Sequence, residues 1–217
     1  MIFGKIDFLN LLPFHVFIKR HIRSSHTKSI IRHKRNVPSY INNEFKNKRV
    51  DGAFISSIES RKSRCLDIGI VAKKEVQSVL VFEGTLQFDK ASATSNKLSQ
   101  ILELQGEIVI GDRALKRYLN GEPCIDMAEV WNKKTGLPFV FARFCYNRHR
   151  KYFERLGKKF LHTEHKIPQY ILKKESQKVG IAQKDILNYL EKISYDIDKK
   201  SKKGLNLFLS KADKISK

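Results

Sequence analysis

Small hydroxyl and amide side chains recur in this 217-residue chain where a predicted strand gives way to a predicted helix. In open α/β sheets, ligands bind beyond the carboxyl ends of the strands, where the next helix begins. Free backbone N–H groups at a helix start, with hydroxyls beside them, bind carboxylate or phosphate. Two such sites would suit a substrate with two separated carboxylates. The residues at these junctions are Asn10, Ser56, Ser57, Ser92, Thr94, Ser95 and Asp112.

For any single one of these residues, helix capping alone is the simpler explanation, because Ser, Thr, Asn and Asp are the preferred N-cap residues. Asn10 could tie off a turn, and Asp112 could cap its own helix. Glu59 follows Ser56 by three residues, which is the spacing of a capping box. The recurrence of such residues at the same edge of two successive blocks favours a ligand-binding cleft.

Other catalytic patterns are missing from the sequence. It has no GxSxG elbow, no GxxxxGK[ST] loop and no GxGxxG after a strand, and its seven histidines lack the HExxH spacing. Cys65, Cys124 and Cys145 form no CxxC pair, so we expect free thiols in a reducing compartment and no metal site. Glu59 and Asp112 are the only acids near the expected cleft, which is therefore poor in protein acids and bases.

The elements that must position these residues alternate between strand and helix along the first two thirds of the chain. Strands are predicted over residues 1–9, 29–33, 52–55, 68–72, 76–83, 107–110 and 137–144. Helices are predicted over residues 13–21, 37–48, 92–104, 111–119 and 127–135, with another beginning at residue 56 and only amphipathic helices after residue 147.

This alternation predicts an α/β fold with mostly parallel sheets. The extended segments around Ser78 and Phe141 would carry the chain between two lobes. Residues 1–77 would form the first lobe, completed by the helical segment 147–217, and residues 78–146 a second, smaller lobe.

The net charge of +21 and the pI of about 9.9 raise the question of nucleic-acid binding. The basic residues are spread along the chain without interleaved aromatics, and no zinc-finger, RNP-like or KH motif is present, so nucleic acid is the weaker interpretation. A positive field would also concentrate an anionic small substrate. No apolar run reaches the ~18 residues of a membrane span. We expect a cytoplasmic protein outside the membrane.

Seven motifs, in order, resemble the signature of the chorismate dehydratase family, which opens the futalosine route to menaquinone. They are "GKIDFLNLLPF", "VPSYINNEF", "AFISSIES", "VQSVLVF", "SATSNKL", "VIGDRAL" and "VWNKKTGLPFVFA". The resemblance is collinear over residues 1 to about 145. It implies a two-lobed type II periplasmic-binding-protein-like fold with a cleft between the lobes. The segment between "TS" and "IGD" is shorter than in many members, so we expect a small second lobe.

The resemblance implies that chorismate loses water to give 3-[(1-carboxyvinyl)oxy]benzoate, with no cofactor and no metal. Asn10 would be catalytic, at the reacting ring near the departing hydroxyl, and Ser78 would contact the substrate at the lobe crossing. Ser92, Thr94 and Ser95 would hold a carboxylate, Ser56 and Ser57 would line the wall of the first lobe, and Asp112 the floor of the second.

Because the cleft offers few bases, we hypothesise that the substrate's own enolpyruvyl carboxylate removes the ring proton. Two alternatives share the fold: the sister enzyme 1,4-dihydroxy-6-naphthoate synthase, and a non-catalytic solute-binding protein for a small dicarboxylate. The sequence leaves the oligomeric state open.

Overall fold

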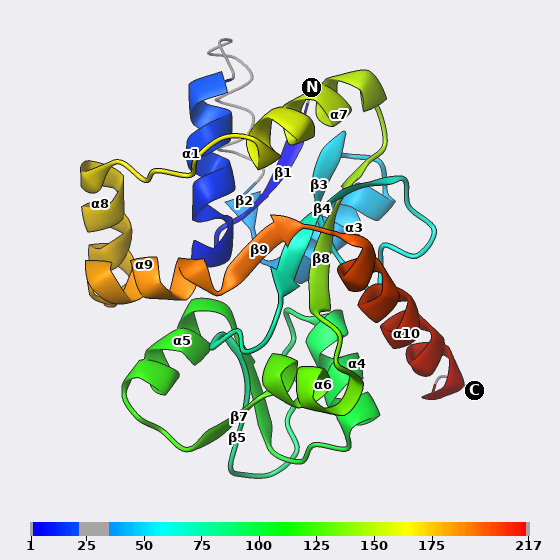
Figure 1. Cartoon of the computed structure of the whole chain (residues 1–217), viewed down its shortest axis with the longest axis vertical. Helices are drawn as coiled ribbons and strands as arrows, with labels where there is room; N and C mark the ends of the chain where they lie inside the picture. Colours follow the sequence, from blue (N-terminus) through cyan, green and yellow to red (C-terminus); the bar gives the residue numbers. More distant parts are fainter. Residues whose placement is uncertain (1, 22–34, 216–217) are drawn as a thin grey trace.

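The chain folds around two β-sheets with helices packed against both (Figure 1). The computed structural model describes residues 2–21 and 35–215. The larger sheet has six strands in the order β2-β1-β3-β8-β4-β9, and the smaller has three in the order β6-β5-β7. The strands are β1 (Phe3–Ile6), β2 (Arg35–Asn36), β3 (Gly52–Ser56), β4 (Cys65–Ala72), β5 (Val79–Phe82), β6 (Glu107–Ile110), β7 (Cys124–Asp126), β8 (Phe139–Tyr146) and β9 (Ile193–Asp196).

A 3-10 helix, η1 (Leu9–Leu11), joins β1 to the first α-helix. The α-helices are α1 (Leu12–His21), α3 (Pro38–Lys46), α4 (Ala93–Leu102), α5 (Gly111–Leu119), α6 (Met127–Thr135), α7 (Arg150–Leu161), α8 (Gln169–Val179), α9 (Gln183–Glu191) and α10 (Lys199–Ile215). The predicted α/β class is therefore confirmed, and the two sheets correspond to two lobes.

The prediction of mostly parallel sheets is wrong. β1 pairs in parallel with β2 and β3, whereas the other pairings among the described strands are antiparallel. The reason lies in the two strands at the crossings. β5 carries the chain into the smaller sheet and runs against β6 and β7, and β8 carries it back and runs against β3 and β4.

The predicted helix beginning at residue 56 is also wrong, since residues 57–63 form turns after β3. Two serine hydroxyls explain this, because each bonds a backbone carbonyl. The hydroxyl of Ser57 donates to the carbonyl of Val140 at 2.5 Å, and that of Ser60 donates to the carbonyl of Ser57 at 2.9 Å. Such bonds compete with a helical backbone. The strand predicted over residues 29–33 lies outside the described residues.

The C-terminal third is not wholly helical, because β9 completes the larger sheet against β4. The predicted lobe boundary at residue 146 also needs a correction. It assigns β8 to the smaller lobe, whereas β8 pairs in the larger sheet. Helix α10 packs against both β8 and α4, so the C-terminal segment contacts both lobes (Figure 1). The rest of the division at residues 77 and 78 stays a prediction.

A cluster of phenylalanines forms the core beneath α1. The ring of Phe14 lies 4.9 Å, centre to centre, from the rings of Phe54 on β3 and Phe160 on α7. Phe3 and Phe144 contact the same ring from β1 and β8. Burial of each such side chain stabilises the fold by about 1.5–3 kcal/mol. The cluster fixes α1 on the sheet and so fixes the η1 turn that carries Asn10.

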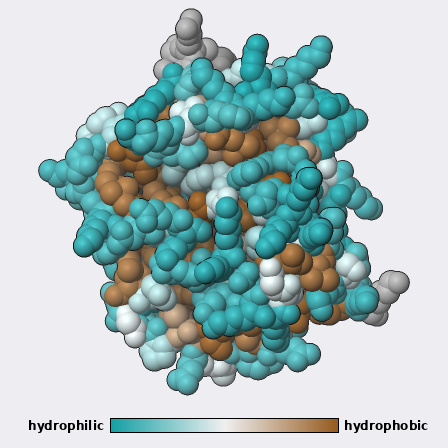
Figure 2. Space-filling view, viewed as in Figure 1, coloured by the Kyte–Doolittle hydropathy of each residue, from teal (hydrophilic) through white to brown (hydrophobic). Residues whose placement is uncertain are grey.

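Hydrophilic side chains cover most of the face shown in Figure 2, with apolar residues visible between them. Within residues 2–21 and 35–215, no helix combines the length and the apolar character needed to cross a membrane.

The prediction of three free thiols is wrong for two of the cysteines. Cys65 on β4 and Cys145 on β8 form a disulfide, and Cys124 remains free. The two bonded residues are 80 apart in sequence. The antiparallel pairing of β4 with β8 places them opposite each other, and no spacing rule in the sequence reveals that.

This pairing predicts the outcome of a thiol count. In the denatured but unreduced protein, only Cys124 should react with a thiol reagent, and all three cysteines should react after reduction. The Cys124→Ser variant serves as the control, because it should show no reactive thiol before reduction. Three reactive thiols in the unreduced protein would contradict the pairing.

Candidate active site

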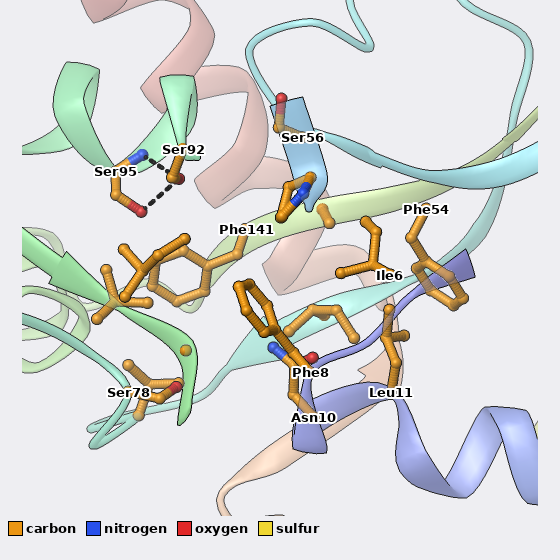
Figure 3. Close-up of a pocket in the computed structure, with 17 residues that line it drawn as sticks. Ile6, Phe8, Asn10, Leu11, Phe54, Ser56, Ser78, Ser92, Ser95 and Phe141 are labelled. Carbon is orange, nitrogen blue, oxygen red and sulfur yellow. Dashed lines mark hydrogen bonds between the residues drawn. The ribbon is translucent and has the colours of Figure 1, made fainter. Parts of the chain in front are cut away.

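A cavity lies between the two sheets and takes residues from both lobes (Figure 3). Most of its wall is apolar, and the rings of Phe8 and Phe141 project into its centre. The described residues that line it include no Asp, Glu, Lys, Arg or His. Five of the sequence-predicted residues line it and supply its polar groups: Asn10, Ser56, Ser78, Ser92 and Ser95. No group of three or more potential metal ligands occurs among the described residues.

Asn10 lies in the η1 turn, between β1 and α1, and faces the cavity (Figure 3). The turn is closed by the backbone N–H of Leu11, which donates to the carbonyl of Phe8 at 3.0 Å. The carbonyl of Asn10 accepts a hydrogen bond from the hydroxyl of Tyr195 on β9, at 2.6 Å. The side-chain oxygen Oδ1 is buried and has no hydrogen-bond partner among the described residues. An unpaired buried acceptor is costly, and Asn10 lines the cavity, so its side-chain amide is well placed to bind a polar atom of a ligand.

Ser92 and Ser95 occupy the N-terminus of α4 (Figure 3). The backbone N–H of Ser95 donates to Oγ of Ser92 at 3.1 Å, which makes Ser92 the N-cap of the helix. The two hydroxyl oxygens lie 2.8 Å apart. The helix N-terminus carries a partial positive charge, and the pair of hydroxyls adds donors beside it. This end of the cavity is therefore suited to a carboxylate.

Ser56 lines the opposite wall, at the end of β3, and is held by Asn42 on α3. The amide nitrogen Nδ2 of Asn42 donates to Oγ of Ser56 at 2.9 Å, and the backbone N–H of Ser56 donates to Oδ1 of Asn42 at 3.2 Å. Because Asn42 uses the oxygen of Ser56 as an acceptor, the hydroxyl hydrogen is left to point elsewhere.

Ser78 lies just before β5, where the chain enters the smaller lobe, and its hydroxyl oxygen accepts a hydrogen bond from the hydroxyl of Tyr189 at 2.9 Å. Its carbonyl accepts from the backbone N–H of Gly111 at 2.8 Å. Gly111 has a φ of +67° and lies against the ring of Phe8, so a Cβ atom there would come within 2.9 Å of that ring. Glycine therefore allows the second lobe to approach the η1 turn closely.

Two other predicted residues do not line the cavity but link the two lobes beside it. Oγ1 of Thr94 accepts a hydrogen bond from the backbone N–H of Ile58 at 3.1 Å. Oδ1 of Asp112 accepts from the backbone N–H of Leu9 at 3.0 Å. Ser57 does not line the cavity either, and its hydroxyl donates to the carbonyl of Val140 on β8. These three side chains thus bond other parts of the fold, whereas the sequence analysis predicted that they contact the substrate.

The bonds of Thr94 and Asp112 hold the cavity in a closed form. Its volume is about 70 Å³. This is below the ~300–1,000 Å³ that is typical of small-molecule sites. A ligand with a six-membered ring can therefore enter only after the lobes part or the rings of Phe8 and Phe141 turn aside.

A prediction about pH follows from Asp112. Burial raises the pKa of its carboxyl from 3.8 to about 6, although the hydrogen bond from Leu9 lowers it. The folded chain thus holds this proton more tightly than the unfolded chain, so the contribution of Asp112 to stability falls as the pH rises from about 4 through 6. Asp112→Asn, which keeps an acceptor for Leu9 and removes the charge, should raise the free energy of unfolding by roughly 1–3 kcal/mol at pH 8.

Chemical unfolding at two pH values checks this expectation. At pH 4 the wild-type carboxyl is already largely protonated in the folded state, so the gain in the free energy of unfolding of Asp112→Asn should disappear. The same variant tests a catalytic role for this residue. Loss of turnover in Asp112→Asn, with folding intact, would identify the carboxylate as the base.

Two functional contacts come from residues that the sequence did not single out. Tyr189 on α9 and Tyr195 on β9 reach Ser78 and the carbonyl of Asn10 from the lysine-rich C-terminal third. Both side chains are buried. Their signal in the sequence is weak, because a tyrosine on an amphipathic helix or edge strand is typical of ordinary core packing.

Known proteins are similar to this chain in sequence and in fold. The family model described as "Menaquinone biosynthesis" matches residues 99–214. A chorismate dehydratase from Campylobacter jejuni is 43% identical over 214 residues, which cover 96% of each chain.

Among solved structures, a protein from Archaeoglobus fulgidus matches with a TM-score of 0.69 at 11% identity, over 99% of this chain and 97% of that one. The alkanesulfonate-binding protein of Xanthomonas axonopodis matches at 0.52 and 10% identity, over 100% and 92%. A Candida albicans protein with the generic periplasmic binding protein fold matches at 0.54 and 9% identity, over 100% and 91%. At such identities these structures show the fold alone, and they confirm the predicted periplasmic-binding-protein-like fold.

Proposed function

Since the chain belongs to the chorismate dehydratase family of menaquinone biosynthesis, we propose that it is a lyase that removes water from chorismate to give 3-[(1-carboxyvinyl)oxy]benzoate. The observation that carries the site assignment is Asn10, which lines an apolar cavity together with other polar groups and whose Oδ1 is buried without a partner among the described residues. Phe8 and Phe141 give this cavity flat apolar surfaces for a ring.

The substrate's two carboxylates need binding groups in a cavity that has no cationic side chain among the described residues of its lining. The N-terminus of α4, with the hydroxyls of Ser92 and Ser95, is the best-equipped place for one of them. The net charge of +21 supports binding in another way, because a positive field raises the local concentration of a dianion before it enters.

The chemistry needs little from protein acids and bases. The ring proton beside the ether oxygen is activated by the ring carboxylate through the intervening double bond, and loss of water makes the ring aromatic. The substrate's enolpyruvyl carboxylate removes this proton, while Asn10 holds the departing hydroxyl. Positioning alone can supply a large part of the acceleration in such an intramolecular step.

The experiment is to incubate the purified chain with chorismate and follow ultraviolet absorbance and product mass. Enzyme-dependent loss of one water, with the spectrum of an aromatic ether, is the expected result. Binding without turnover would replace the proposal by a solute-binding function. Absence of both would direct the same assay to the substrate of 1,4-dihydroxy-6-naphthoate synthase.

A further inference from the structure

The hydroxyl of Tyr189 lies behind the cavity and contacts one of the residues that line it. Tyr189 comes from α9 and is 1% exposed. Its hydroxyl donates to Oγ of Ser78 at 2.9 Å. Tyr189 itself does not line the cavity. One buried group thus holds the polar side chain at the point where the chain enters the smaller lobe.

The hydrogen-bond inventory fixes the direction of the Ser78 hydroxyl. Its oxygen receives the hydrogen of Tyr189, so its own hydrogen must point away from Tyr189. Ser78 lines the cavity, which is the free direction. The cavity is thus presented with a hydrogen-bond donor, the hydroxyl of Ser78. The oxygen of a ligand hydroxyl can accept from this donor.

We propose that Tyr189 is a positioning residue that orients Ser78 towards the departing hydroxyl of the substrate. The inference rests on the proposed function. The oxygen of the substrate hydroxyl accepts from Ser78. As the carbon–oxygen bond breaks, the bond from Ser78 strengthens, because negative charge develops on that oxygen.

The step is balanced without any change in the charge of the protein. The enolpyruvyl carboxylate takes the ring proton, the electrons of the broken C–H bond form the new ring double bond, and the hydroxyl leaves with its bonding pair. The proton then passes from the carboxyl group to the departing hydroxide, which gives water. Ser78 and Tyr189 keep their protons. Burial raises the pKa of Tyr189 well above its ordinary value, with smaller effects in the same direction from Asp112 and Asp126, so the phenol stays a donor.

The first experiment compares Tyr189→Phe with the wild type in the chorismate assay. We expect kcat to fall roughly tenfold, since the bond that orients the Ser78 donor is lost while the ring remains. KM should stay within about twofold, because Tyr189 does not touch the cavity. Tyr170→Phe is the matched control, because Tyr170 on α8 is 68% exposed and should give wild-type kinetics.

Inhibition by the product separates positioning from packing. The product lacks the hydroxyl that Ser78 is inferred to hold, so its inhibition constant should be the same in Tyr189→Phe and in the wild type. Weaker product binding in parallel with the loss of kcat would indicate a distorted cavity and would overturn the inference. An unchanged kcat in a folded Tyr189→Phe variant would also overturn it.

Ser78→Ala keeps the proposal testable if the Tyr189 variant does not fold. This variant removes the donor itself, so kcat should fall at least as far as in Tyr189→Phe, and wild-type kcat would overturn the proposal. In the double variant, kcat should be close to that of Ser78→Ala, because Tyr189 acts on the departing group largely through Ser78. A wild-type chain that does not convert chorismate would instead reject the proposed function, and this inference with it.

Discussion

Replacing Asn10 with alanine should lower kcat for chorismate by roughly 10²–10³-fold, the loss typical of removing one group that holds the departing or charged oxygen of a transition state. The expectation rests on Asn10, which lines the cavity and whose Oδ1 is buried without a partner among the described residues. The side-chain amide is therefore available to bind the substrate, so its loss affects both binding and chemistry.

The fold of this variant should remain intact. The η1 turn is held by its own backbone bond and by the hydroxyl of Tyr195, which contacts the carbonyl of residue 10 and not its side chain. The unfolding midpoint of Asn10→Ala should therefore lie close to that of the wild type. Asn206→Ala is a suitable control, because Asn206 is exposed on α10. Wild-type kcat in a folded Asn10→Ala variant would remove this residue from the mechanism.

Replacing Asp126 with alanine should lower the free energy of unfolding by roughly 3–5 kcal/mol, the largest loss expected from one side chain outside the hydrophobic core. Asp126 is 8% exposed, and its carboxylate accepts four backbone N–H groups. Oδ1 accepts from Ala128 and Glu129 at 2.9 and 3.1 Å, which caps α6. Oδ2 accepts from Val76 and Gln77 at 2.8 and 2.6 Å.

The second pair of bonds gives this residue its importance for function. Val76 and Gln77 belong to the segment that carries the chain from β4 to β5, directly before Ser78. Each buried N–H left without an acceptor costs about 1–3 kcal/mol, although relaxation and water recover part of that cost. Loss of the carboxylate thus destabilises the crossing and displaces Ser78, so kcat should fall as well.

Urea unfolding followed by far-ultraviolet circular dichroism measures the predicted loss. Asp213→Ala is the matched control, because its carboxylate is 60% exposed and pairs with Arg61 at the surface, where such a pair contributes about 0–1 kcal/mol. Asp126→Asn, which keeps one acceptor oxygen, should lie between the two. A loss below about 1 kcal/mol in Asp126→Ala would show that the four bonds are readily replaced by water.

Local patterns in the sequence predicted most of the elements. The proline-led helices at Pro38 and after Leu12, the strand over Gly52–Ser56 and the left-handed stop at Gly136 follow from properties of a few adjacent residues. The junction residues Asn10, Ser56, Ser92 and Ser95 likewise line the cavity, because strand–helix junctions face the cleft in this architecture.

What the sequence by itself determined is therefore local: the periodicity of helices and strands, the polar residues at their junctions, and an ordered set of motifs that places the chain in its family. Tertiary structure alone decided which of these residues meet. The disulfide between Cys65 and Cys145, the bonds of Thr94 and Asp112 across the cleft, and the contact of Tyr189 with Ser78 each join residues far apart in sequence. The physical reason is that strand order and lobe closure arise from the burial of the whole core, which no short stretch of sequence encodes.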